Sequence, residues 1–375
     1  MTPFFQLDPK IESASAAALQ QVAPRFTEID EVTEYNQLKV LRAFMDNGIS
    51  ERHFGSSTGY GYGDEGRETL DKVWAQVFGA EDALVRHNFT CGTHTLAVAL
   101  FGVLRPGDKM LCVSGMPYDT LHSVIGLTGE NMGSLKDYGI AFDCVPLKEE
   151  HLDYEAIAKA VDDTVTMVYI QRSRGYELRA SLSLEETQKV AEIAKEKNPN
   201  CIVMVDNCYC EFVNKQEPTQ VGADLIAGSL IKNAGGGMAR TGGYIAGRAD
   251  LVELCAHRLT APGVGKEVGC TLGESRNMFI GLFLAPTVVA AAVKTAVLTS
   301  AVCQNLGYAV TPRWDEKRTD IIQAITLGDE ASLVAFCQGV QKGAPVDAYV
   351  TPEPWDMPGY ESQVIMAAGA FTMGA

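Results

Sequence analysis

Short apolar runs alternate with helix-forming segments through the middle of this chain, and that alternation limits the fold more than any other feature. Such runs are typical of strands buried on both faces of a parallel sheet. Helical segments at 93–103, 119–126, 152–160 and 184–197 separate several of them, as crossover helices do. We therefore predict an α/β domain with a mostly parallel seven-stranded sheet. Its strands are expected at 83–87, 109–114, 142–147, 164–170, 201–207, 225–230 and 243–247.

Helical patterns also flank this region. Residues 13–46 and 67–79 are predicted to be helical, and the glycine-rich loop GSSTGYGYGDEG (55–66) lies between them. A long helix is expected at 276–306, and we predict that it is buried rather than membrane-spanning, because its apolar part contains Pro286 and Lys294. A second, smaller α/β unit is expected over 308–375. It would contain a strand near 319–326, a helix at 329–341 and strands at 346–350 and 363–370.

Composition excludes some classes of function. The net charge of −16 argues against nucleic-acid binding, which needs clustered Lys and Arg. The ten cysteines are spread out, and the pair Cys208 and Cys210 has no second ligand pair nearby, so we predict no metal site and a reducing compartment. The N-terminus lacks the pattern of a signal peptide. These features predict a cytoplasmic protein that binds neither nucleic acid nor membrane.

Polar residues gather just after the predicted strands. Ligands of open α/β sheets bind beyond the carboxyl ends of the strands, so these residues are the candidates for a site. They are Cys91, Gly92 and Thr93, then Tyr118, then Arg172 and Arg174, then Asp206, and finally Ser229 and Lys232.

Simpler interpretations exist for each of them. Asp206 and Lys232 could form a structural ion pair, Arg172 and Arg174 could lie in a solvated loop, and Gly235–Gly237 could be a flexible turn. Two phosphate-binding motifs fail. The glycines follow Lys232, whereas a P-loop has them before its lysine, and the glycines at 59–63 have the wrong spacing for a dinucleotide fingerprint.

One ligand, pyridoxal phosphate (PLP), accounts for the polar strand ends together. Its aldehyde needs a lysine amine, which Lys232 offers, and its ring nitrogen needs a buried carboxylate, which Asp206 offers. Tyr118 can stack on the ring. The phosphate needs N–H groups at a helix start, which Gly92 and Thr93 supply. The hydroxyl of Ser229 can add to that phosphate site.

The order of these residues resembles the fold-type I PLP-dependent enzymes, whose fold is aspartate aminotransferase-like. Several longer stretches are similar to the methionine gamma-lyase-like family, also called aluminium-resistance or cystathionine beta-lyase-like proteins. They are YGYGDEGRETLD (60–71), IQRSRGYELRASLSLEE (170–186), VDNCYCEF (205–212), SLIKNAGGGMARTGGYIAG (229–247) and GLFLAPTVV (281–289).

The resemblance implies a role for each residue. Lys232, Asp206 and Tyr118 would be catalytic and would also hold the cofactor ring. The phosphate would be bound by Cys91, Gly92, Thr93 and Ser229, and by Tyr60 or Tyr62 reaching across from a neighbouring subunit, with Arg67 as a weaker candidate. The family's substrate-binding arginine lies on a C-terminal strand, but no arginine follows Arg318 here. Either the chain is truncated, or Arg172, Arg174 or Arg179 binds the substrate carboxylate.

The resemblance also implies an assembly and a reaction. It implies a homodimer or homotetramer with shared active sites. Residues 1–65 would contribute to the neighbouring subunit, 66–285 would bind PLP, and 286–375 would form the linking helix and a small domain that ends early. The implied reaction is β- or γ-elimination from a small sulfur amino acid such as cystathionine, cysteine or methionine. Transamination, aldol cleavage and a non-catalytic PLP-fold protein are the alternatives, with an NAD-type protein a more distant one.

Overall fold

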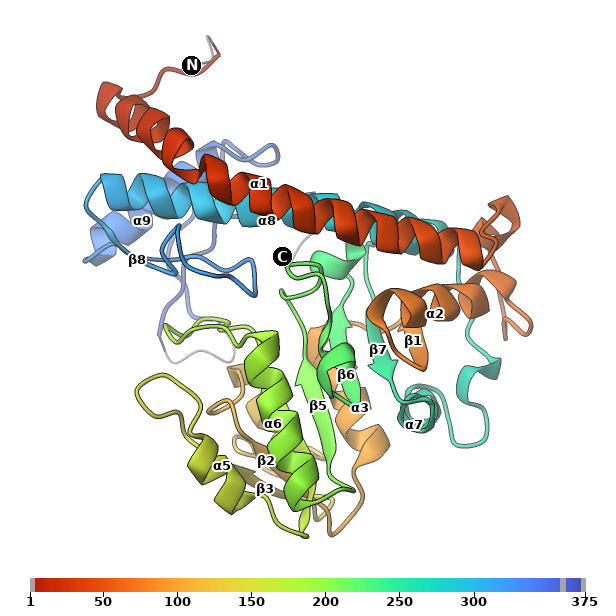
Figure 1. Cartoon of the computed structure of the whole chain (residues 1–375). Helices are drawn as coiled ribbons and strands as arrows, with labels where there is room; N and C mark the ends of the chain where they lie inside the picture. Colours follow the sequence, from red (N-terminus) through yellow and green to blue (C-terminus); the bar gives the residue numbers. More distant parts are fainter. Residues whose placement is uncertain (1–3, 358–361, 372–375) are drawn as a thin grey trace.

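A computed structural model describes residues 4–357 and 362–371, and a seven-stranded sheet forms its centre (Figure 1). The strand order is β1-β7-β6-β5-β4-β2-β3. Strand β7 runs antiparallel to β1 and β6, and the other neighbouring strands pair in parallel. The strands are β1 (Asp82–Arg86), β2 (Lys109–Cys112), β3 (Ala141–Cys144), β4 (Val165–Gln171), β5 (Ile202–Asp206), β6 (Leu225–Ser229) and β7 (Gly243–Gly247).

Alternate residues of each strand face opposite sides of the sheet, and each side has its own core. In β4, Val168 and Ile170 belong to one apolar cluster, whereas Met167 and Tyr169 belong to the other. The first cluster includes residues of α1 (Pro9–Asp46), α2 (Glu65–Phe78), α5 (Tyr154–Ala160), α6 (Leu184–Lys197) and α8 (Ser275–Asn305). The second includes residues of α3 (Gly92–Val103), α4 (Asp119–Ile125) and α7 (Ala249–Leu259). The domain is therefore a three-layer α/β/α sandwich.

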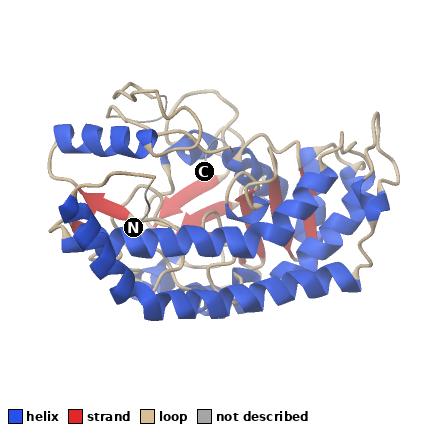
Figure 2. Cartoon of the chain, turned by 90° about the horizontal axis from the view of Figure 1, so that it is seen from above, coloured by secondary structure: helices blue, strands red, loops and turns tan. Residues whose placement is uncertain are grey.

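The two longest helices lie side by side along one side of the molecule (Figures 1 and 2). In their contact, Phe44 of α1 meets Phe279 and Phe283 of α8, with ring centroids 5.8 and 5.6 Å apart. Helix α8 is long and apolar enough to cross a membrane, but 50% of its most apolar window is buried inside the protein. Its apolar character is thus used in packing, as expected for a core helix.

The sequence located the central elements well. All seven predicted strands are present, and so are the predicted helices, with small differences at their ends. Helix α7 was not predicted, and neither was β8 (Ala309–Thr311).

The C-terminal predictions are less accurate. Helix α9 (Glu330–Lys342) is confirmed, but only β9 (Ala324–Thr326) lies within the strand expected at 319–326, and it pairs antiparallel with β8. The strand expected at 346–350 is wrong, because Asp347 has a φ of 55° and starts a turn. The strand expected at 363–370 is also wrong, since Val364 makes only an isolated bridge with Trp355. Helix α8 runs without a break past residue 285, so the division into folding units there stays a prediction.

Candidate active site

The carboxyl ends of the parallel strands bring the predicted site residues together. Asp206 is the last residue of β5 and Ser229 the last of β6. Across the sheet, Asp206 lies opposite Gln171 of β4 on one side and opposite Ala227 of β6 on the other. Lys232 follows β6 by three residues, in the turn that leads into a short 3-10 helix at Asn233–Gly235. The fold therefore places the lysine and the carboxylate on neighbouring strand ends.

The Lys232 side chain lies among groups that stabilise a positive charge. Its Nζ atom is 4.0 Å from the ring centroid of Tyr209. Burial alone would lower the pKa of Lys232, but Cys208, Tyr209 and Asp206 outweigh burial and raise it above its usual value. In the protein without a cofactor, Lys232 is therefore an ammonium group, and burial has not made it a free amine.

Asp206 is almost fully buried, with 5% of its surface exposed. Its Oδ1 accepts a hydrogen bond of 3.0 Å from the Cys208 N–H. Burial raises the pKa of the carboxyl, and the nearby Lys232 charge opposes that rise. A buried carboxylate needs a cationic partner, and a protonated ring nitrogen would be one in addition to Lys232.

The N-terminus of α3 lies beside the lysine. A Cβ atom built on Gly92 would be 3.5 Å from Ser229 Cβ and 4.0 Å from Lys232 Nζ. Among the described residues, no acceptor binds the N–H groups of Gly92 and Thr93, and the buried Ser229 hydroxyl also has no partner. The positive end of a helix dipole beside an ammonium group favours an anion between them. These open donors fit the phosphate of PLP.

Cys91 and Thr93 are partly engaged elsewhere. Cys91 is the N-cap residue of α3, and its Sγ accepts a 3.4 Å bond from the His94 N–H. The Thr93 hydroxyl bonds the hydroxyls of Tyr118 and Thr120, each at 2.9 Å. Their backbones thus remain better candidates for phosphate binding than their side chains.

Tyr118 is fixed at both ends. Its hydroxyl meets Thr93, and its backbone N–H donates to Gln171 Oε1 at 2.8 Å. Burial and the negative charge of Asp206 raise the pKa of Tyr118, so its phenol stays neutral. Gln171 itself was not predicted as a site residue, yet it connects Tyr118 to the end of β4.

Two glycines after Lys232 let the turn pack against α8. A Cβ on Gly236, which has a φ of 54°, would lie 2.2 Å from the carbonyl oxygen of Gly281, and a Cβ on Gly235 would lie 1.6 Å from that of Leu230. No side chain fits at such distances. Gly235 and Gly236 therefore let the lysine turn lie close to the helix, so these two glycines are more than a flexible turn.

The three candidate arginines are held by the protein itself. Arg172 is fully buried and bonds the Leu182 carbonyl, Asn207 Oδ1 and Asn214 Oδ1 at 3.2, 3.1 and 2.7 Å. A substrate could reach it only by displacing those bonds, which argues against the predicted role. Arg179 bonds Glu177 and nearby carbonyls. Arg174 bonds only Thr311 through its terminal nitrogens and leaves its buried Nε unpaired, so it is the better candidate of the three.

The glycine-rich loop presents its two tyrosines outward. Tyr60 and Tyr62 are 74% and 69% exposed, and their ring centroids are 5.6 Å apart. The described chain thus places neither ring in its own Lys232 site. Exposed paired aromatic rings of this kind are suited to contact with another chain.

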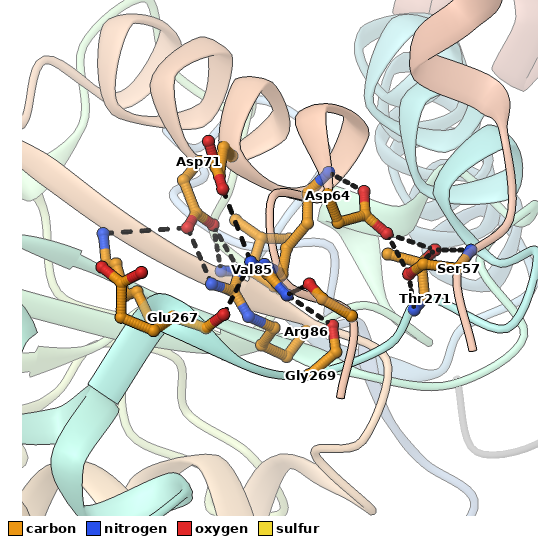
Figure 3. A network of polar contacts seen from close by, with 12 residues as sticks. Ser57, Asp64, Asp71, Val85, Arg86, Glu267, Gly269 and Thr271 are labelled. Carbon is orange, nitrogen blue, oxygen red and sulfur yellow. Dashed lines mark hydrogen bonds and ion pairs between the residues drawn. The ribbon is translucent and has the colours of Figure 1, made fainter. Parts of the chain in front are cut away.

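A polar network fixes the backbone of this loop (Figure 3). The Asp64 carboxylate accepts hydrogen bonds from Ser57 and, at 2.8 Å, from Thr271. Arg67 is buried and donates to the carbonyls of Gly61 and Gly269 at 2.7 and 2.8 Å. The Arg67 guanidinium is therefore engaged in holding the loop against residues 267–271.

Three residues around the lysine were not predicted from the sequence. Cys208, Tyr209 and Glu211 follow Asp206 in the motif VDNCYCEF. The Tyr209 ring contacts Lys232, Cys208 interacts with the lysine charge, and the Glu211 carbonyl accepts a 3.2 Å bond from Asn233 Nδ2, on the residue after Lys232. Tyr209 has a φ of 70°, which is unusual for a residue other than glycine. The signal that could have found Glu211 is an acidic residue between the apolar neighbours Cys210 and Phe212.

Known proteins share this fold. The fold matches that of the pyridoxal-5'-phosphate dependent protein YhfS from Escherichia coli with a TM-score of 0.63, at 17% identity over 92% of this chain and 93% of that one. A carbon-sulfur lyase involved in aluminum resistance from Clostridium novyi NT matches with a TM-score of 0.95, at 50% identity over 98% of this chain and 87% of that one. The architecture is that of the fold-type I PLP-dependent enzymes.

Sequence comparison then gives the family. The methionine gamma-lyase profile matches residues 11–375. The uncharacterized protein YnbB of Bacillus subtilis (strain 168) is 49% identical over 93% of this chain and 83% of its own length. This chain belongs to the methionine gamma-lyase family, as its motifs predicted.

Proposed function

We propose that this protein is a PLP-dependent carbon–sulfur lyase that eliminates a thiol from the Cβ or Cγ of a sulfur amino acid of the cystathionine, cysteine or methionine class. The observation that carries the proposal is the juxtaposition of Lys232 with the open donors at the start of α3 and with Asp206. Membership of the methionine gamma-lyase family and the similarity to a Clostridium novyi carbon-sulfur lyase support the reaction class.

Each residue would act on a defined part of the cofactor or substrate. PLP, when bound, supplies an aldehyde for amine attachment and a ring that withdraws electrons from the substrate Cα. Lys232 Nζ would hold the aldehyde carbon and move protons at the substrate Cα and Cβ. Asp206 would keep the ring nitrogen protonated, and Tyr118 would cover the ring. The phosphate would bind the N–H groups of Gly92 and Thr93 at the Cys91 cap and the hydroxyl of Ser229.

The proposed assembly is a homodimer or homotetramer with shared sites. Tyr60 and Tyr62 are exposed on a loop whose backbone is already held by Arg67 and Asp64. A loop with fixed backbone loses little entropy on binding, so it is suited to reach the phosphate site of a neighbouring copy. Arg174 remains the proposed contact for the substrate carboxylate.

We also place the protein in the cytoplasm. All ten cysteines are free thiols, which suits a reducing compartment. Cell fractionation with an antibody against the chain tests this placement.

Two measurements test the function. The purified full-length protein is mixed with PLP, and the visible absorbance of the lysine-bound cofactor is recorded for wild type and Lys232→Ala. We expect the band in wild type alone. The loaded protein is then incubated separately with cystathionine, cysteine and methionine, and thiol and 2-oxo acid are measured. A wild-type protein that binds PLP but releases neither product from any of the three would point to transamination or aldol cleavage instead. A wild-type protein that never binds PLP would overturn the proposal altogether.

A further inference from the structure

Two cysteines lie side by side at one edge of the central sheet. Strand β3 is the last strand in the sheet order and pairs in parallel with β2 (Figure 1), and Cys144 of β3 lies directly opposite Cys112 of β2. The Val145 N–H donates to the Cys112 carbonyl at 2.8 Å, which continues this register past the ends of both strands. Residues opposite each other on neighbouring strands point to the same face of the sheet, and both side chains belong to the same apolar cluster.

The spacing of these two residues suits a disulfide. Neighbouring strands lie about 4.8 Å apart, and the Cα atoms of a disulfide are usually about 4.4–6.8 Å apart. Both cysteines are free thiols. Among the strand pairs that the structure describes, this is the only one that sets two cysteines opposite each other.

The two thiols differ in access and in acidity. Cys112 is fully buried, whereas Cys144 is half-buried on the edge strand. A hydrogen bond from the Cys112 thiol lowers the pKa of Cys144, although burial and the charge of Asp143 oppose it. The same hydrogen bond and burial raise the pKa of Cys112. Because an oxidant attacks an accessible thiolate first, Cys144 is the thiol that should react, with Cys112 beside it as the second thiol.

Cys112 also connects to the segment that carries Tyr118. Its one proton has a second acceptor in the Gly115 carbonyl oxygen, which lies 2.9 Å from the Cys112 sulfur. Between them, the Ser114 hydroxyl accepts a 2.9 Å bond from the Gln171 N–H, and Gln171 Oε1 accepts the bond from the Tyr118 N–H. A disulfide sulfur has no proton to donate, so oxidation would remove the bond to Gly115 from this segment.

We propose that Cys112 and Cys144 form a modification site, at which a peroxide creates a reversible disulfide and so releases one hydrogen bond of the segment that leads to Tyr118. The Cys144 thiolate attacks a peroxide oxygen, the O–O bond breaks and hydroxide leaves, which oxidises the sulfur to a sulfenic acid and reduces the peroxide. The Cys112 sulfur then attacks the Cys144 sulfur, the S–O bond breaks, and the oxygen leaves as water with the Cys112 proton. Two thiols and one hydrogen peroxide thus give one disulfide and two waters.

A disulfide of this kind is compatible with the proposed cytoplasmic location. Disulfides in a reducing compartment are usually transient and serve catalysis or redox sensing, because cellular thiols reduce them again. The formation of the disulfide does not depend on the proposed function. Its effect on cofactor binding does rest on the proposed function, through the position of Tyr118.

Trypsin separates the two cysteines, which makes the test direct. Cleavage after Lys109, Lys136 and Lys148 gives peptides 110–136 and 137–148, and each of them contains one cysteine. The reduced full-length protein is treated with hydrogen peroxide, its remaining thiols are blocked with N-ethylmaleimide, and its peptides are analysed by mass spectrometry without reduction. We expect the two peptides to be linked, at the sum of their masses less two hydrogens, and to separate after dithiothreitol. Absence of the linked peptide would overturn the inference.

Single replacements identify the order of the two steps. Cys144→Ser should abolish the link, and Cys112→Ser should leave Cys144 as a sulfenic acid that dimedone traps. Cys337→Ser is the matched control, because Cys337 of α9 is also half-buried but interacts with no second thiol, so the yield of linked peptide should not change. A disulfide that Cys112 still forms in Cys144→Ser would show that the assigned pair is wrong.

Hydrogen exchange tests the effect on the segment without any cofactor. Backbone amides of residues 113–118 should exchange faster in wild type after peroxide than before it, since the Gly115 carbonyl has lost its thiol donor. The same amides should exchange equally before and after peroxide in Cys144→Ser. Unchanged exchange in fully linked wild type would overturn the link between the disulfide and the Tyr118 segment.

Cofactor binding separates this inference from the proposed function. Peroxide should weaken PLP binding roughly two- to fivefold more in wild type than in Cys144→Ser, in keeping with the loss of one hydrogen bond near the site. Reduced Cys144→Ser should bind PLP as wild type does. If wild type binds no PLP in either state, the proposed function fails, while the peptide link still decides the inference. If PLP binds and the linked peptide never forms, only the inference about the cysteines fails.

Discussion

The glycine-rich loop and the lysine turn are both glycine-rich segments held against the same large domain, but their polar groups are used differently. Around the loop, the Asp64 and Asp71 carboxylates have protein partners, and Asp71 forms a paired contact with Arg86 at 2.7 and 3.0 Å (Figure 3). Around the lysine turn, the buried Ser229 hydroxyl and one oxygen of Glu211 have none among the residues that the structure describes.

This difference suggests that the loop network serves the stability of the fold and that the lysine turn serves ligand binding. A buried polar group without a partner costs free energy, so one that lies beside a candidate ligand site is a candidate contact for that ligand. The loop network should therefore govern stability, and the lysine turn should govern cofactor binding and reactivity. Five substitutions, the last two as a matched pair, test that separation in order of decreasing expected effect.

Replacing Lys232 by Ala should give the largest effect, and on activity alone. We expect the rate of product release in the PLP-loaded protein to fall at least about 10⁴-fold, because the residue that moves the protons is gone. The thermal unfolding midpoint of the cofactor-free protein should change little, because burial already raises the pKa of Asp206 and that carboxyl can take up a proton once its cationic neighbour is gone. A variant that retains more than about a tenth of the wild-type rate would exclude Lys232 as the catalytic base.

Replacing Arg86 by Ala should have the opposite effect: a large loss of stability and no change in cofactor binding. Asp71 would be left buried without its main cationic partner, although Lys266 lies 3.7 Å away. We expect the free energy of unfolding to fall by about 3–5 kcal/mol, measured by urea denaturation. Below the unfolding transition, the bound-cofactor spectrum should be unchanged. An altered spectrum in the folded variant would contradict the separation of the two regions.

The pH dependence of stability should distinguish Glu211 from other carboxyls. The pKa of Glu211 is about 8 in the folded protein, above the ordinary carboxyl value of about 4.3, so the folded state keeps a proton that the unfolded chain has lost. Its contribution to stability is complete below about pH 4 and is lost as the pH rises to about 8. Relative to Glu211→Gln, wild type should lose up to about 1.4 kcal/mol of unfolding free energy per pH unit in that window, by urea denaturation. A difference between the two proteins that is independent of pH would contradict the raised pKa.

Two serine replacements, one in each region, are expected to give the smallest effects, and they remove the same chemical group. Ser229→Ala removes a hydroxyl without a partner, so the stability of the cofactor-free protein should stay within about 0.5 kcal/mol, while PLP affinity should fall about tenfold.

Ser57→Ala is its control in the loop network. It removes a hydroxyl that donates to Asp64 and accepts from the Thr271 N–H at 3.0 Å. Ser57→Ala should lower the free energy of unfolding by about 1–2 kcal/mol. It should leave the affinity for PLP within about twofold of wild type. If the two serine variants changed the free energy of unfolding and the PLP affinity by the same amounts, the proposed difference between the two regions would be wrong.

Much of the fold could be predicted because its signals are local. A strand buried on both faces is a continuous apolar run, and the runs that form β4, β5 and β6 stand out for that reason. The C-terminal strands were predicted less well, since the segments at 346–350 and 363–370 have apolar residues but belong to no sheet in the described structure. An apolar run indicates burial, and only a neighbouring strand makes it part of a sheet.

The candidate site could be predicted in part. Asp206 and Lys232 follow directly from polar residues at the ends of buried runs, and the structure places them on neighbouring strand ends. The arginines could not be assigned from sequence, because Arg172 and Arg174 occupy similar positions in QRSRGY. Their different partners, Asn214 and Thr311, come from distant segments of the chain.

The sequence by itself determined the sheet, the family and the lysine–carboxylate pair, because strand periodicity and motif order are written in consecutive residues. Only the tertiary structure decided which polar groups are satisfied. Arg67 meets Gly269, some two hundred residues away in sequence, and Glu211 meets Tyr244 across the core, whereas the Ser229 hydroxyl has no hydrogen-bond partner among the described residues. Hydrogen-bond partners depend on distances in space, and no local pattern of residues specifies those distances.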